Sequence, residues 1–248
     1  MARTNNLTNF LTDVATAIKT KKGDNTPIPA SNFDTEITNL PSGGGNNANI
    51  DGTKYITGTR VSSTLTTIPA IDISSLSVNS MSYMFAECQE LETINVTNSS
   101  KVKNMNYVFY KCYKLRNVPT TLDTSNVTSM TYMFSYCSLI ETIPNNINMS
   151  KVANATAMFG NCSSLENVPV FDWSSLASTS SNINMFNGCT NLTNQSLDNI
   201  LQSCVTATKI STKTLSQMGF SSENYPASTI QALPHYQDFI NAGWTIGY

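Results

Sequence analysis

The sequence predicts an α/β solenoid, in which a repeated unit stacks a parallel sheet against short helices. Three observations predict it. An apolar motif recurs along the middle of the chain, its hydrophobic period changes within each unit, and both ends lack the motif. The repeat is clearest in its phenylalanines, which follow one another at steps of about 25 residues, inside the range of solenoid repeats. They are Phe85, Phe109, Phe134, Phe159 and Phe186.

Each unit combines two periods. In the third unit Met130, Met133, Phe134 and Cys137 lie at i, i+3, i+4 and i+7, which predicts a helix of about two turns. The following run has the L-x-x-L-x-L form of a short strand in a leucine-rich repeat, as in the segment 91–96. One unit cannot bury its apolar stripe alone, so stacked units form the core. The sequence therefore predicts a leucine-rich-repeat solenoid over residues 50–194.

The first 40 residues are predicted to form a helical segment that anchors the protein or makes it oligomerise. Two apolar stripes separated by a Pro-Ile-Pro joint predict a longer and a shorter helix. They have little to pack on within the chain, because the Gly- and Asn-rich linker 41–49 separates them from the repeats. The residues expected to contact another subunit or protein are Leu7, Leu11, Val14, Ile18, Phe33 and Ile37.

Residues 195–248 are predicted to cap the stack with helices. Helical patterns cover 196–204, 212–218 and 229–242, the last interrupted at Pro234, and 244–248 is a candidate final strand. A cap at this end would cover the apolar face that the last repeat leaves open.

Composition excludes several function classes. With a net charge of -2 and 12% charged residues, the chain lacks the basic surface that nucleic acid requires. No apolar run is long enough for membrane insertion, and the first residues do not form an export signal. The repeated cysteines lack zinc-ligand spacing and are predicted to be buried thiols, so neither metal nor cofactor is expected. The one histidine, His235, has no catalytic signature around it, and we expect no enzyme.

A tyrosine cluster is the first candidate contact surface. Tyr83, Tyr107 and Tyr132 lie between the two core methionine positions, and Tyr110, Tyr113 and Tyr136 join them in the middle units. Tyrosine offers a large contact area with a polar group. The alternative is that these rings form a ladder that packs neighbouring helices together.

A charged row is the second candidate. Glu92, Arg116, Glu141 and Glu166 occupy one position of successive strands, so Arg116 is expected to bridge Glu92 and Glu141. The row is either a solvated face or a mildly acidic surface for a ligand.

The repeat motif resembles the BspA-type leucine-rich repeats, also described from Mycoplasma surface lipoproteins, over about residues 65–194. Residues 7–33 resemble the N-terminal segment of predicted bacteriophage virion proteins, and 241–248 is similar to the ends of phage repeat proteins. These resemblances imply a virion-surface component such as a tail or fibre protein. Other virion proteins would bind residues 1–40, the chain would be a homo-oligomer, and the repeats would bind a host cell-surface glycan or protein. The alternatives are a bacterial cell-envelope adhesin and a polysaccharide-degrading tail enzyme.

Overall fold

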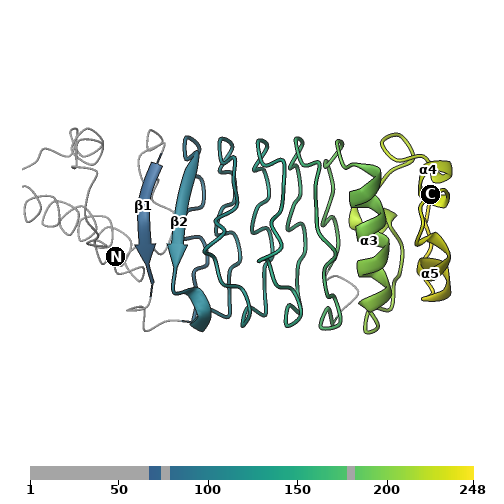
Figure 1. Cartoon of the computed structure of the whole chain (residues 1–248), viewed down its shortest axis with the longest axis horizontal. Helices are drawn as coiled ribbons and strands as arrows, with labels where there is room; N and C mark the ends of the chain where they lie inside the picture. The colour runs from purple at the N-terminus through teal and green to yellow at the C-terminus, as the bar shows by residue number, and fades with distance from the viewer. Residues whose placement is uncertain (1–66, 74–78, 178–181) are drawn as a thin grey trace, which may run out of the picture.

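A computed structural model describes residues 67–73, 79–177 and 182–248. Figure 1 shows the coils of the repeat segment side by side in a row, with the last helices at its C-terminal end. The elements are β1 (Thr67–Asp72), β2 (Thr93–Thr97), the 3-10 helices η3 (Ser99–Lys101) and η4 (Ser216–Met218), and the helices α3 (Asn194–Thr206), α4 (Ala227–Gln231) and α5 (Tyr236–Asn241). The predicted anchor residues, with the linker 41–49, lie outside the described residues.

The prediction of a helix in each repeat is wrong. An α-helix would join the N–H of Phe134 to the carbonyl of Met130. Instead this N–H donates to the carbonyl of Met158 in the next coil, at 2.9 Å. The N–H groups of Tyr132 and Tyr136 likewise donate to the next coil, at 2.9 and 2.7 Å. Alternate amides of this run therefore point along the stack.

The run is a string of tight turns. In the third unit the N–H groups of residues 133, 135 and 137 each donate to the carbonyl three residues back, those of Met130, Tyr132 and Phe134. The third residues of the first and last of these turns, Tyr132 and Tyr136, have φ of 54° and 65°. Such turns require a left-handed residue at this position. We call residues 81–88, 105–112, 130–137, 155–162 and 182–189 the turn runs.

The turn runs form a continuous ladder from coil to coil. Parallel bridges join Ser80 to Asn104, Asn104 to Ser129, and Ser129 to Asn154. The same N–H positions donate in successive coils, as Phe85 does to Val108 and Phe109 to Met133, at 3.0 and 2.9 Å. The regular pairing of the stack thus lies where the sequence predicts helices.

Among the described residues, the predicted strands form only in the first two coils, as β1 and β2. β1 and β2 pair in parallel, with a register shift between Ile68 and Ile71. In the described part of the later coils the corresponding pairing is the single bridge between Thr142 and Asn167. The position of Asn95 in β2 is occupied by Pro119 and Pro144 in the next two coils, and proline has no N–H to donate.

The predicted core is confirmed. The repeated Met, Phe, Cys and Leu side chains are buried, most of them completely. The phenylalanine rings stack along the row, with centroids 5.6 Å apart for Phe85 and Phe109 and 5.4 Å for Phe109 and Phe134. The stack continues through Phe159 to Phe186 at 6.0 and 5.4 Å. These rings supply much of the apolar area that the coils bury together.

The buried cysteines also join adjacent coils. The thiol of Cys112 donates to the carbonyl of Phe85 at 3.1 Å, and Cys137 donates to Phe109 at the same distance. Cys162 and Cys189 repeat this contact with Phe134 and Phe159. A cysteine at this position therefore fills the core and satisfies a carbonyl that points along the stack.

The C-terminal residues contain shorter helices than predicted. α3 covers the predicted 196–204 helix, and Thr193 caps it by accepting the N–H of Ser196 at 3.2 Å. The pattern at 212–218 yields only η4, and 229–242 is divided between α4 and α5 around Pro234. The predicted strand at 244–248 is a single parallel bridge between Thr214 and Thr245.

We predict that Lys111→Gly is more stable than Lys111→Ala by about 1 kcal/mol, because an L-residue is strained in the left-handed region and glycine is not. Lys111 has φ of 57°, and both variants lose its contact with Glu87 equally. Urea unfolding of the two purified variants measures the difference. Equal stabilities would contradict the turn geometry. Gly188 occupies the same place in the last turn run, with φ of 74°.

We also predict that alkaline pH destabilises the fold. Burial raises the pKa of Cys88 and of Cys189 from 9.0 to about 12, and that of Tyr225 from 10.0 to about 12. Because these folded-state values exceed the unfolded ones, the stability from the neutral groups is present below pH 9.0 and is lost as pH rises towards 12. Urea unfolding under reducing conditions should show a constant free energy up to about pH 8 and a steady fall above it. A flat profile through pH 9.0 to 12 would rule out buried neutral thiols.

Candidate functional site

Tyrosine side chains of three successive coils stack on one another outside the core. The rings of Tyr83 and Tyr107 are 4.6 Å apart and 6° from parallel, and those of Tyr107 and Tyr132 are 4.9 Å apart and 9° from parallel. All three residues have left-handed backbones, with φ of 62°, 58° and 54°. Each is the third residue of its turn, between two buried methionine positions or their equivalent. The repeated turn therefore aligns the rings.

Two further tyrosines stand edge-on to this stack. The ring of Tyr110 is 5.4 Å from Tyr107 and 6.2 Å from Tyr132, and Tyr136 lies 5.9 Å from Tyr110. Edge-to-face pairs at such distances are favourable. Together these residues form what we call the tyrosine ladder: Tyr83, Tyr107, Tyr110, Tyr132 and Tyr136.

The tyrosine ladder remains accessible. Tyr83 is 43% exposed and Tyr136 is 38% exposed, while Tyr107, Tyr110 and Tyr132 are half-buried. Because the rings stack along the row, their edges and hydroxyl groups are the parts that can face outward. Burial first, and then the neighbouring Tyr83 and Tyr132, raise the pKa of Tyr107. Tyr107 therefore presents a neutral phenol at physiological pH.

The structure thus brings together five of the six tyrosines that the sequence singled out. Tyr113, which is 36% exposed, takes part in none of the ring contacts of the described residues. The two interpretations are compatible, because the rings pack neighbouring coils and are also exposed. The elements that they join are turns instead of helices. The binding role of the ladder stays a prediction.

A polar ladder beside the tyrosines escaped the sequence prediction. The hydroxyl of Ser82 donates to Asn104 Oδ1 at 2.8 Å, and that of Ser129 donates to Asn106 Oδ1 at 2.7 Å. Asn106 Oδ1 also accepts the N–H of Thr131 at 2.8 Å. These amides are used within the stack, so they position the turns that carry the tyrosines.

The predicted bridging role of Arg116 is wrong. Among the ion pairs of the described residues, Lys114 joins Glu90 at 2.5 Å and Lys111 lies 3.7 Å from Glu87, and Arg116 is in neither. Arg116 and Glu141 are exposed and Glu92 is half-buried. Exposed pairs gain little free energy, so nothing holds the Arg116 side chain against its neighbours. The row is a solvated face in this structure.

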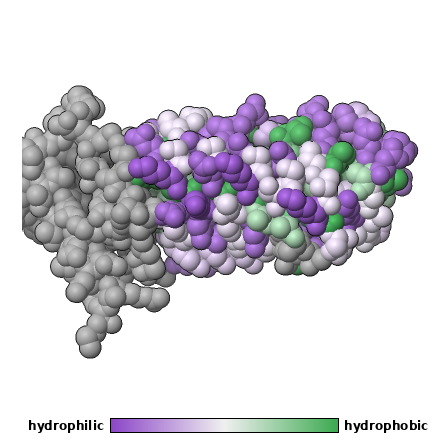
Figure 2. Space-filling model, turned by 90° about the horizontal axis from the view of Figure 1, so that it is seen from below, coloured by the Kyte–Doolittle hydropathy of each residue, from purple (hydrophilic) through white to green (hydrophobic). Residues whose placement is uncertain are grey.

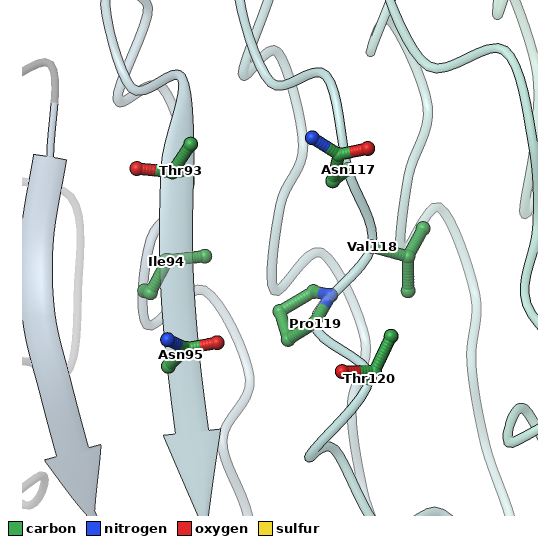
Figure 3. A pocket seen from close by; sticks show the side chains of 7 residues that line it. All are labelled: Thr93, Ile94, Asn95, Asn117, Val118, Pro119 and Thr120. Atoms are coloured by element: carbon green, nitrogen blue, oxygen red, sulfur yellow. The ribbon is translucent and has the colours of Figure 1, made fainter.

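A cavity of about 300 Å³ lies between β2 and the next coil (Figure 3). Its lining comes from two segments, and Figure 3 shows Pro119 on the segment opposite β2. No sequence signal singles it out, because Pro69, Pro144 and Pro169 occupy the position of Pro119 in other coils. The lining residues are Thr93, Ile94, Asn95, Asn117, Val118, Pro119 and Thr120.

His235 has a structural contact. Its Nδ1 lies 2.7 Å from Asp198 Oδ2, and its backbone N–H donates to Asp198 Oδ1 at 2.9 Å. Asp198 is a buried residue of α3. The pair therefore joins α3 to the start of α5.

Neither a metal site nor a membrane-spanning helix is found among the described residues. Within residues 67–73, 79–177 and 182–248, no three His, Cys, Asp or Glu side chains gather as a metal site would require. Over the same residues, none of the helices has both the length and the apolar character to span a membrane.

Residues 79–200 match a family model described as a Mycoplasma protein of unknown function, DUF285. A search of the curated proteins finds no match.

Solved leucine-rich-repeat structures are similar to part of the chain. A leucine-rich repeat protein from Bacteroides ovatus is 25% identical over 50% of this chain and 30% of its own, with a TM-score of 0.33. A leucine rich cell surface protein from Faecalibacterium prausnitzii is 22% identical over 52% and 38%, with a TM-score of 0.37. A leucine-rich repeat protein of T. pallidum is 19% identical over 52% and 73%, with a TM-score of 0.32. The chain thus covers well under half the length of the first two.

The family match covers all five units in which the Met, Phe, Cys and Leu positions recur, and the start of the segment that follows the fifth. Residues 79–200, which hold the repeats, are therefore similar to this Mycoplasma family, and the match covers just under half of the chain.

Proposed function

We propose that this protein is a non-enzymatic recognition protein whose repeats are displayed on a bacterial cell envelope and bind a partner through the tyrosine ladder. The observation that carries the proposal is the cluster of five tyrosines, two of them more than a third exposed, on an otherwise neutral surface. Aromatic residues that combine apolar area with a hydroxyl are enriched where proteins bind partners.

The surface around the ladder supports recognition without strong charge. The chain has a net charge of -2, and the ion pairs described near the ladder neutralise Lys111 and Lys114. Figure 2 shows hydrophilic and intermediate residues over most of the described surface in that view, with small hydrophobic patches among them. Specificity would therefore come from hydroxyl and amide hydrogen bonds and from aromatic contact.

The bacterial envelope is the preferred setting because the matched family is bacterial and covers the repeats. The virion setting rests on the resemblances at residues 7–33 and 241–248, which lie outside the repeats. In that setting residues 1–40 would bind other virion proteins, and the repeats would bind a host glycan or protein. In both settings the ladder is the contact surface, so one experiment tests the binding role.

We predict that replacing Tyr83 and Tyr136 together by Asn weakens binding to bacterial surfaces about tenfold or more, as expected when exposed aromatic anchors are removed. Asparagine tolerates the left-handed backbone of both positions, so the turns are kept. The measurement is retention of the labelled full chain on whole bacterial cells and on their purified wall glycans, with thermal unfolding as the check on folding.

Tyr113→Asn is the matched control, since Tyr113 is 36% exposed but outside the ladder. The proposal predicts loss in the double variant, retention in the control, and bound glycans of unchanged length. Equal retention of the double variant and the parent would contradict the ladder as contact surface. Shortened glycans would show an enzyme instead.

A further inference from the structure

We propose that the cavity between β2 and the next coil binds one or two rings of a neutral saccharide. We call this cavity the β2 groove, lined by Thr93, Ile94, Asn95, Asn117, Val118, Pro119 and Thr120. It is a second site, separate from the tyrosine ladder. Residues 91–96 and their equivalents in later coils bury their apolar side chains in the same core as the turn runs. The outward side chains of the two sets therefore point in opposite directions.

The groove exists because pairing between these two coils stops early. The N–H of Arg116 donates to the carbonyl of Glu92 at 3.2 Å. Two coils later the pairing continues further, because Ile143 donates to the carbonyl of Asn167 at 2.8 Å, although Pro144 and Pro169 occupy the position of Pro119 there. The corresponding bond from Ile94 to Asn117 is not among the backbone hydrogen bonds of the described residues, and the groove lies at that place.

The far side of the groove is held in place. The Asn146 amide donates to the carbonyls of Leu122 at 2.9 Å and Pro119 at 3.3 Å, and so ties the segment after Pro119 to the third coil. The residue at the same place one coil earlier is Thr121, whose shorter side chain has no amide to span a gap. A side-chain amide therefore ties the second coil to the third, and no equivalent amide of the described residues ties the second coil to β2.

The lining suits an uncharged, hydroxyl-rich ligand. Ile94, Val118 and Pro119 are buried and form an apolar floor, while the Thr and Asn side chains of both walls are exposed. Asn95, Asn117 and Thr120 make no side-chain hydrogen bond to any residue that the structure describes, so their amide and hydroxyl groups can bind a ligand. A sugar ring matches this arrangement, with a C–H face for the floor and hydroxyls for the walls.

Charge and size narrow the ligand class. None of the lining residues is charged, and the nearest charges in sequence, Glu92 and Arg116, have opposite signs at the same end. An ionic ligand would lose hydration without gaining a counter-charge. The volume of about 300 Å³ is at the lower limit for small-molecule sites, which suits one or two rings.

The experiment uses the full chain with three neutral disaccharides: cellobiose, maltose and diacetylchitobiose. Saturation-transfer NMR detects binding, and calorimetry gives the dissociation constants. We expect at least one of them to bind. Asn117→Ala and Thr120→Ala should each weaken it about tenfold, as expected for losing a hydrogen bond that the ligand cannot replace.

Thr120→Ser keeps the hydroxyl and should keep most of the affinity. Asn145→Ala is the matched control, because Asn145 is an exposed residue at the position of Thr120 in the next coil. Failure of all three sugars to bind at millimolar concentration would overturn the proposal. So would binding that the groove variants leave unchanged.

The two proposals can fail separately. Sugar binding that is lost in the Tyr83 and Tyr136 double variant and kept in the groove variants would place the sugar on the tyrosine ladder and refute the groove. Loss in the groove variants alone supports the groove, whether or not the ladder binds cells.

Discussion

The structure depends on the hydrogen bonds that alternate amides of each turn run donate to the next coil. In the second coil these donors are Tyr107, Phe109 and Lys111, each 2.9 Å from a carbonyl of the third coil. The cysteine thiol adds one bond to the preceding coil, so each coil is joined to both neighbours. Buried polar groups are costly when unpaired, so a stack of turns is stable only while successive coils stay in register.

This constraint also decides which side chains face outward. The left-handed residue of the first turn in each run is a tyrosine, alanine or asparagine between two inward-facing positions, and the ladder of N–H groups repeats that placement from coil to coil. The tyrosine ladder is thus a consequence of the backbone pairing, as is the phenylalanine stack on the inner side. On the strand side the pairing between β2 and the next coil is incomplete, and the β2 groove lies there. Regular pairing therefore produces one candidate surface, and its interruption produces the other.

Much of the core could be predicted from the sequence, because the burial of Met130, Phe134 and Cys137 requires only that the repeat recurs. The sequence could not show whether each run is a helix or a string of turns. The spacing i, i+3, i+4 and i+7 places side chains on one side in both cases. A left-handed tyrosine gives no signal in a single sequence, whereas Gly188 at the equivalent place in the last run hints at it.

Some features of the candidate sites could be predicted from the sequence and others could not. The tyrosine cluster followed from periodicity, because identical positions of stacked coils must be neighbours. The expected contacts of Arg116 did not follow, because exposed flexible side chains are not fixed by register. The groove required knowing which backbone hydrogen bonds are absent, since Pro144 and Pro169 repeat the position of Pro119 in coils where the pairing continues.

The most direct test is an NMR measurement of scalar couplings across hydrogen bonds, which identify the carbonyl that accepts each amide. The structure predicts that the amide of Phe109 couples to the carbonyl carbon of Met133 in the next coil. Coupling of this amide to Met105, four residues back, would show that the run is an α-helix and would contradict the coil-to-coil pairing.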